Sequence, residues 1–95
     1  MAESTAQTES DHATITVRVL LFSLLREKVG RRELEVTLSS SATGEDLLDR
    51  LAEEHPAVAE HQGALRLAIN QTYAPHEEQL SDGDEVALIT PVSGG

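Results

Sequence analysis

The stretch Thr14–Phe22, TITVRVLLF, decides how the rest of the chain is read. Branched apolar residues stand at the odd positions of Ile15–Leu21 and alternate with the residues at the even positions. Side chains alternate between the two faces of a strand, so this pattern predicts a strand with one buried face. Phe22 would then point to the opposite face.

The residues that follow predict a short helix and a second strand. Ser23–Val29 has the composition of a short helical turn, with Ser23 as its expected N-cap and Gly30 as its left-handed stop. Glu33–Leu38 alternates again between apolar and polar residues. We expect the two strands to form a hairpin-like pair across this connection.

The best helix in the sequence covers Thr43–Glu54. Thr43 and Asp46 have the spacing of a capping box, with Asp in the place usually held by Glu or Gln. His55-Pro56 should end the helix, because a residue before proline avoids the helical region. The apolar stripe expected to face the core consists of Leu47, Leu48, Leu51 and Ala52.

Two further strands are expected after a looser segment. They are Leu65–Asn70, followed by a turn at Asn70-Gln71 and a loop through Pro75, and Glu85–Thr90, preceded by the turn signal Ser81–Asp84. The order of strands around one main helix predicts an α+β fold, a mixed sheet packed on that helix. A β-grasp arrangement, with the first and last strands adjacent at the centre of the sheet, fits this count.

Length and composition restrict the protein classes further. The 95 residues suffice for one small domain, with 17 acidic and 7 basic residues and no cysteine. The absence of cysteine excludes disulfides, thiolate metal sites and a cysteine nucleophile. We divide the chain into a disordered acidic arm at residues 1–13, a domain at residues 14–91 and a flexible tail at residues 92–95.

The charge and the apolar runs bear on partners and location. A net charge of −10, with cations that form no stripe in the sequence, opposes binding to nucleic acid. The acidity suits solubility or a salty cytoplasm, and it would also steer the chain toward a basic groove. Val17–Leu25 is too short to span a bilayer and Met1–His12 lacks a signal segment, so we expect a cytoplasmic protein without membrane contact.

The side chains offer no complete catalytic constellation. The four histidines, His12, His55, His61 and His76, are scattered and lack the spacing of a metal site. No phosphate-binding glycine loop occurs in the sequence. We therefore expect no metal and no catalysis by this chain alone.

The distinctive segment is the final one, Pro91–Gly95, with the sequence PVSGG. Gly94 and Gly95 make it thin and flexible, since glycine carries no Cβ. Four residues beyond Pro91 reach about 13 Å when extended. We expect such a tail to thread a narrow channel and present the carboxylate of Gly95.

Three stretches together resemble the MoaD family, the ubiquitin-like sulfur-carrier subunits of molybdopterin synthase. They are Val19–Glu27, Leu67–Thr72 and Leu80–Gly95, and the last is the most specific, with DGDEV, an apolar strand and PVSGG in order. The resemblance covers about Ile15–Gly95. The thiazole-pathway carriers share the fold and the Gly-Gly end, but Arg26-Glu27 favours the molybdopterin branch.

The resemblance implies a function in molybdenum cofactor biosynthesis. An E1-like (MoeB-like) enzyme would adenylate the carboxylate of Gly95 with ATP, and a cysteine desulfurase or rhodanese would supply sulfur to give a thiocarboxylate. With Gly94 threaded into the large (MoaE-like) subunit, the thiocarboxylate would donate sulfur to the cyclic pterin precursor. No cofactor would be bound permanently, and two copies would join a dimer of the large subunit as a heterotetramer.

The resemblance also implies a partner-binding surface. Its expected residues are Phe22, Tyr73, Ile89, Arg26, Pro91, Val92 and Ser93. Tyr73 and Ile89 depart from the commoner Leu and Phe of the family. From the residues alone, Phe22 is either part of this surface or ordinary core. Arg26 either contacts an acidic partner residue or pairs with a neighbouring Glu.

Three other functions remain open from the sequence. A ubiquitin-like modifier would form isopeptide bonds through Gly95 and would need the same adenylation. A thiazole-pathway carrier would serve thiamine synthesis. A plain interaction domain would use no tail chemistry.

Overall fold

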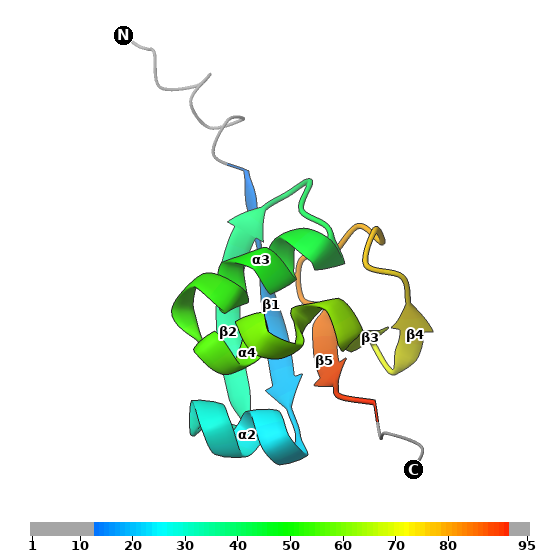
Figure 1. The fold of residues 1–95 in the computed structure, drawn as a ribbon. Coiled ribbons are helices and arrows are strands. Elements are labelled where there is room, and N and C mark those ends of the chain that lie inside the picture. Colours follow the sequence, from blue (N-terminus) through cyan, green and yellow to red (C-terminus); the bar gives the residue numbers. More distant parts are fainter. Residues whose placement is uncertain (1–12, 92–95) are drawn as a thin grey trace, which may run out of the picture.

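The structure is a computed structural model that describes residues 13–91. The predicted tail and nearly all of the predicted N-terminal arm lie outside these residues. The elements in chain order are β1 (Thr14–Leu21), α2 (Ser23–Val29), β2 (Glu33–Ser39), α3 (Gly44–Glu54), α4 (Pro56–His61), the 3-10 helix η1 (Gln62–Ala64), β3 (Arg66–Ile69), β4 (Thr72–Ala74) and β5 (Glu85–Ile89). Figure 1 shows α3 and α4 lying across one face of the sheet.

The five strands form one mixed sheet in the order β2-β1-β5-β3-β4. β1 and β5 are parallel, with Val19 opposite Val86 and Leu21 opposite Leu88. β2 pairs antiparallel with β1, and β3 pairs antiparallel with both β5 and β4. The predicted β-grasp arrangement, with the first and last strands together at the centre, is confirmed.

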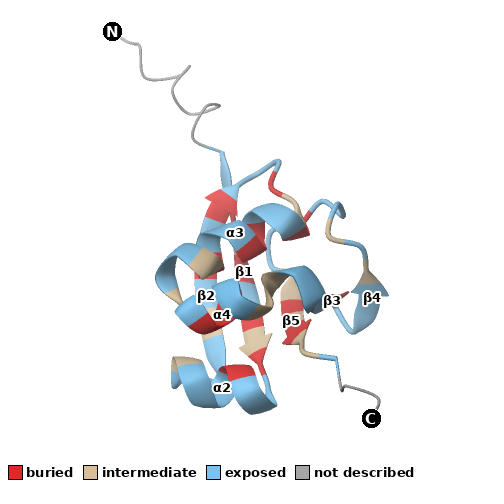
Figure 2. Cartoon of the chain, in the orientation of Figure 1, coloured by how far each residue is buried: buried red, intermediate tan, exposed pale blue. Residues whose placement is uncertain are grey.

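The core lies between the sheet and the helices (Figure 2). Every odd-numbered residue of Ile15–Leu21 is buried, as the alternation predicts. The capping box of α3 is present: Asp46 N–H donates to Thr43 Oγ1 over 3.3 Å, and Thr43 N–H donates to the Asp46 carboxylate over 2.9 Å. The fully buried side chains of α3 and α4 are Leu47, Leu48, Leu51 and Val58.

The predicted N-cap of α2 is wrong. Phe22 is the cap residue, because β1 continues into it in an extended conformation with φ −128°. The Phe22 carbonyl accepts the first two helical hydrogen bonds, from Leu25 N–H at 3.1 Å and Arg26 N–H at 3.3 Å. Ser23 is already inside the helix, whereas Gly30 ends it at φ 84° as predicted.

The segment after α3 is more regular than the sequence indicated. His55 does end α3, but Pro56 starts α4 immediately, since proline fits the first position of a helix. The three residues of β4 were expected to be loop. β4 pairs with β3 across the turn at Asn70 and Gln71, whose positive φ values of 51° and 74° permit the tight reversal.

The turn before β5 is tied to β1 by its backbone. Gly83, at φ 86°, donates its N–H to the Thr16 carbonyl over 2.8 Å. Thr16 N–H in turn donates to Asp82 Oδ1 over 2.8 Å. These bonds place the start of β5 beside β1 and set the register of the parallel pair.

Asp84 closes the same turn from its other side. Its carboxylate accepts Ser81 N–H at 2.8 Å through Oδ2 and the Asn70 side-chain amide at 2.9 Å through Oδ1. Asn70 Oδ1 then accepts Glu85 N–H at 3.0 Å. The DGDE motif therefore has a structural role, since it joins the β3–β4 turn to the start of β5.

Replacing Asp84 with alanine should lower the free energy of unfolding by about 2 kcal/mol, because two donors lose one half-buried acceptor. Asp82→Ala removes the acceptor of one exposed bond and should cost about 1 kcal/mol or less. Urea denaturation followed by circular dichroism measures both. Equal losses for the two variants would contradict the role assigned to Asp84.

Candidate functional site

The sheet face opposite the helices carries a row of apolar side chains. The register places Leu20 of β1 beside Ala87 of β5, Ala87 beside Ala68 of β3, and Ala68 beside Tyr73 of β4. We call these four residues the outer row. Tyr73 is 66% exposed, Leu20 and Ala87 are half-buried, and Ala68 is buried between its neighbours on the sheet. A four-strand apolar row on an open face is typical of a protein-docking surface.

Phe22 and Ile89 extend the outer row at one edge of the sheet. Leu21 pairs with Leu88, so the next residue along each parallel strand, Phe22 and Ile89, lies at the same edge. Phe22 is 47% exposed and stands outside the buried core, and Ile89 is half-buried. Phe22 is thus a surface residue rather than ordinary core, and its contact with a partner stays a prediction.

The same edge is where the chain leaves the domain. β1 and β5 run parallel, so the start of α2 and the residues after Ile89 lie together there (Figure 1). Pro91 is exposed at this point. The other predicted tail residues, Val92, Ser93, Gly94 and Gly95, lie outside the described residues.

A hollow of about 310 Å³ adjoins Phe22 at this edge. Its lining consists of Leu20, Leu21, Phe22, Arg26, Arg32 and Glu33. Arg26 is exposed, and within residues 13–91 it forms no ion pair with a glutamate. The second arginine of the hollow, Arg32, was not singled out in the sequence.

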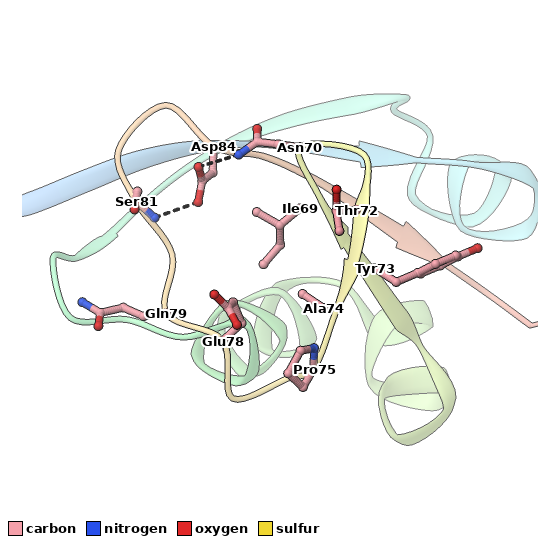
Figure 3. A pocket seen from close by; sticks show the side chains of 10 residues that line it. All are labelled: Ile69, Asn70, Thr72, Tyr73, Ala74, Pro75, Glu78, Gln79, Ser81 and Asp84. Atoms are coloured by element: carbon pink, nitrogen blue, oxygen red, sulfur yellow. Dashed lines mark hydrogen bonds between the residues drawn. The ribbon is translucent and has the colours of Figure 1, made fainter.

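A second hollow lies between β4 and the loop that leads to β5 (Figure 3). Asn70, Ser81 and Asp84 line it, but their polar groups are engaged in the turn network described above. The Tyr73 ring points away from this hollow in Figure 3. The hollow therefore offers no free constellation of catalytic groups.

Two of the described histidines, His61 and His76, make local structural contacts. The His61 ring contacts the Ala57 carbonyl at 2.9 Å, and the His76 ring contacts the Leu65 carbonyl at 2.7 Å and Glu45 at 3.3 Å. Within residues 13–91, no three histidine or carboxylate side chains gather into a metal-binding group. None of the helices in that range has the length and apolarity needed to cross a bilayer.

Three members of the outer row were missed from the sequence: Leu20, Ala68 and Ala87. The alternation that turns Phe22 away from the core also applies to Leu20, and the alternation of Glu85–Thr90 applies in the same way to Ala87 and Ile89. The sequence could therefore have placed Leu20 and Ala87 on the open face. Ala68 and its contact with Tyr73 required the β3–β4 register, because β4 was expected to be loop. Nothing in the sequence predicted that Arg32 would line the same hollow as Phe22.

The class of protein follows from this architecture. A parallel pair of first and last strands, one helical layer and an open opposite face define a ubiquitin-like β-grasp domain. Small archaeal modifier protein 1 from Haloferax volcanii has this fold, with a TM-score of 0.74 and 31% identity over 82% of this chain and 99% of its own. Subunits 1 and 2 of the molybdopterin-converting factor from Helicobacter pylori form a solved complex, one chain of which matches with a TM-score of 0.60 and 22% identity over 85% of this chain and 100% of that chain.

The chain belongs to the ThiS family, whose model matches residues 19–95. It is 32% identical over 93 residues to the molybdopterin synthase sulfur carrier subunit of Arabidopsis thaliana, covering 98% of this chain and 97% of that protein. It is 41% identical over 81 residues to the subunit of the same name from Chlamydomonas reinhardtii, covering 83% of this chain and 98% of that protein. The resemblance to the molybdopterin branch is confirmed.

Phe22→Arg should weaken the affinity for a partner by about tenfold or more if that partner covers the outer row, because a charge would replace an apolar contact. The free energy of unfolding should change little, since Phe22 lies outside the core. Calorimetric titration with the large subunit of molybdopterin synthase measures the affinity. The matched control is Ala59→Arg, which places the same charge on an exposed apolar residue of α4, on the helical side of the sheet.

An unfolded Phe22→Arg protein would contradict the surface role of Phe22. Equal affinity of Phe22→Arg and the native chain would remove Phe22 from the docking surface.

Proposed function

We infer that this chain is the sulfur carrier subunit of a molybdopterin synthase. The observation that carries the inference is its similarity, over most of its length, to carrier subunits from a plant and an alga. The family match runs through the DGDEV segment and PVSGG to Gly95. Within residues 13–91 no group of three histidine or carboxylate side chains could hold a metal ion. The reacting group that we assign is the carboxyl group of Gly95.

The sulfur is carried at the carboxyl group of Gly95. A free carboxylate is ionised at neutral pH and is a poor electrophile, so it must first be activated. A partner enzyme transfers AMP from ATP to the carboxylate, and pyrophosphate leaves. Hydrosulfide displaces AMP directly, or a protein persulfide does so and a thiol then cleaves its S–S bond with formation of a disulfide. The resulting thiocarboxylate donates its sulfur to the cyclic pterin precursor, and the carboxylate of Gly95 is regenerated with an oxygen from water.

Two such donations give the dithiolene of molybdopterin. The small subunit supplies sulfur and the large subunit supplies the pocket and the acid–base groups, so this chain acts as one part of an enzyme complex. No resident cofactor is required, because ATP is used by the adenylating enzyme and the sulfur comes from a separate donor protein.

The outer row, with Phe22 and Ile89, is the docking surface for the large subunit. Its position at the edge where the chain leaves β5 supports this assignment, since a partner bound there would lie next to the start of the tail. The solved complex of subunits 1 and 2 from Helicobacter pylori supports a large-subunit partner. Gly94 and Gly95 would enter the partner's channel, where only a thin segment fits.

A second candidate function is protein modification through Gly95. The observation that favours it is the similarity to small archaeal modifier protein 1. Both functions begin with the same adenylation, and they differ in the group that attacks the activated carbonyl. Sulfur gives the carrier, whereas a lysine amine of another protein gives an isopeptide bond.

The intact mass of the chain tests the carrier chemistry directly. Incubation with ATP, a sulfur source and the adenylating enzyme of the same organism should produce a sulfur-for-oxygen mass increase confined to Gly95. Adducts on lysines of other proteins, with no sulfur gain, would favour the modifier function. An unchanged mass together with the absence of such adducts, with the enzyme active on another carrier, would contradict both functions and leave a plain interaction domain.

The tail should tolerate no added bulk. One alanine added after Gly95, or Gly94→Trp, should lower sulfur transfer at least a hundredfold, because the reacting carbonyl is moved or the channel is blocked. Folding of each variant is measured separately by its urea midpoint, which should stay unchanged. An alanine added before Met1 is the control and should transfer sulfur normally, since the family match begins at residue 19.

Full transfer by either tail variant would contradict threading of the tail.

A further inference from the structure

The expectation that the cations form no stripe in the sequence is wrong for one short segment, in which the positive charge of this acidic chain is concentrated. Residues 26–32 hold four of the seven cationic side chains and only one of the 17 acidic ones. The rest of the chain therefore carries three cations against 16 carboxylates. We call Arg26, Lys28, Arg31 and Arg32 the basic edge.

The fold places the basic edge where the tail begins. Its residues belong to α2 and to the turn after Gly30, and all four are exposed. Leu21 N–H donates to the Arg32 carbonyl over 2.9 Å, which holds Arg32 at the end of β1. Because β5 runs parallel to β1, its last residue Ile89 ends at the same side of the molecule.

The basic edge differs from the other arginine of this region in its pairing. Arg18 contacts Glu85 at 3.0 Å and Glu33 at 3.6 Å, so two carboxylates already offset its charge. Among residues 13–91, none of the four side chains of the basic edge forms an ion pair. Their charge is directed to solvent in the free domain.

Two of these arginines line a hollow together with apolar side chains. Arg26 and Arg32 line the hollow beside Leu20 and Phe22, and its one carboxylate, Glu33, is engaged by Arg18. A guanidinium binds a carboxylate through paired N–H groups, and more strongly where apolar neighbours exclude water. The hollow is continuous with the outer row, which the proposed function assigns to the large subunit.

We propose that the basic edge binds carboxylate side chains at the mouth of the channel in the large subunit that receives the tail. This inference rests on the proposed function. The paired charges orient the domain during its approach, so that the apolar outer row and the tail arrive together. Sixteen carboxylates elsewhere on the chain favour this single orientation by repulsion from the same acidic rim.

The charge balance favours a local acidic rim over an extended anionic partner. Nucleic acid or an anionic membrane presents charge over a wide area, and the many carboxylates of this chain would be repelled from it. A rim that meets only the basic edge avoids this repulsion.

The association rate with the large subunit from the same organism, measured by stopped-flow fluorescence, tests the proposal. Arg32→Glu should slow association at low salt by about tenfold, and the difference should shrink toward nothing at about 1 M salt. Arg50→Glu is the matched control, because it makes the same change of charge on α3, on the helical side of the sheet. It should change the rate by less than about twofold.

Arg26→Glu provides a second variant with the same expected effect. The urea midpoint of each variant establishes that it is folded before its rate is compared.

The opposite outcomes are separable. Equal low-salt rates for Arg32→Glu, Arg26→Glu and Arg50→Glu would overturn the role of the basic edge while leaving the carrier function intact. Tight binding of the native chain to duplex DNA or to phosphatidylserine vesicles, lost in Arg32→Glu, would overturn the choice of a protein partner. A native chain that gains sulfur but never binds the large subunit would overturn both this proposal and the synthase function.

Discussion

The parallel pairing of β1 and β5 is the constraint on which the rest of the structure depends. Two strands separated by more than sixty residues lie side by side, so everything between them must cross over and return. The turn at Asp82–Asp84 secures that pairing through bonds to Thr16 and Asn70. Pairing β1 with β5 closes a long loop, which costs chain entropy. The hydrogen bonds of the turn help to offset this cost.

The same pairing creates the functional edge. One face of the sheet supplies the core and the other supplies the outer row. Because both central strands end together, Phe22, Ile89 and the exit of the chain lie at one edge of the sheet. The positive charge at this edge comes from the connection after β1. α2 folds back over the core through the buried Leu25 and carries its cationic residues to that edge.

Local patterns in the sequence predicted most of the fold. Alternation identified β1, β2 and β5, and the spacing of Thr43 and Asp46 identified α3, because each of these signals acts within a few residues. β4 was missed since three residues cannot display a period, and α4 was missed because Pro56 both ends one helix and begins another. Ser23 was misplaced because tertiary continuity of β1 outweighed its capping preference.

The candidate site was less accessible to sequence reasoning. Phe22, Tyr73 and Ile89 came from the family resemblance, and only the strand register shows which side chains join them. The proximity of Arg26 and Arg32 depends on how α2 returns to the sheet, which no local pattern specifies.

The central place of β5 has a consequence for synthesis of the chain on the ribosome. In the described sheet, β5 joins the β1–β2 pair to the β3–β4 pair, and neither pair contacts the other through a strand ladder without it. A nascent chain that has emerged only as far as β4 therefore has a sheet divided into two strand pairs that no ladder joins, and a two-stranded pair is marginally stable unless it packs against a helix. Completion of the sheet waits for β5, its last strand in chain order, so a product terminated before β5 would be open to proteases instead of competing as a folded decoy for the same partners.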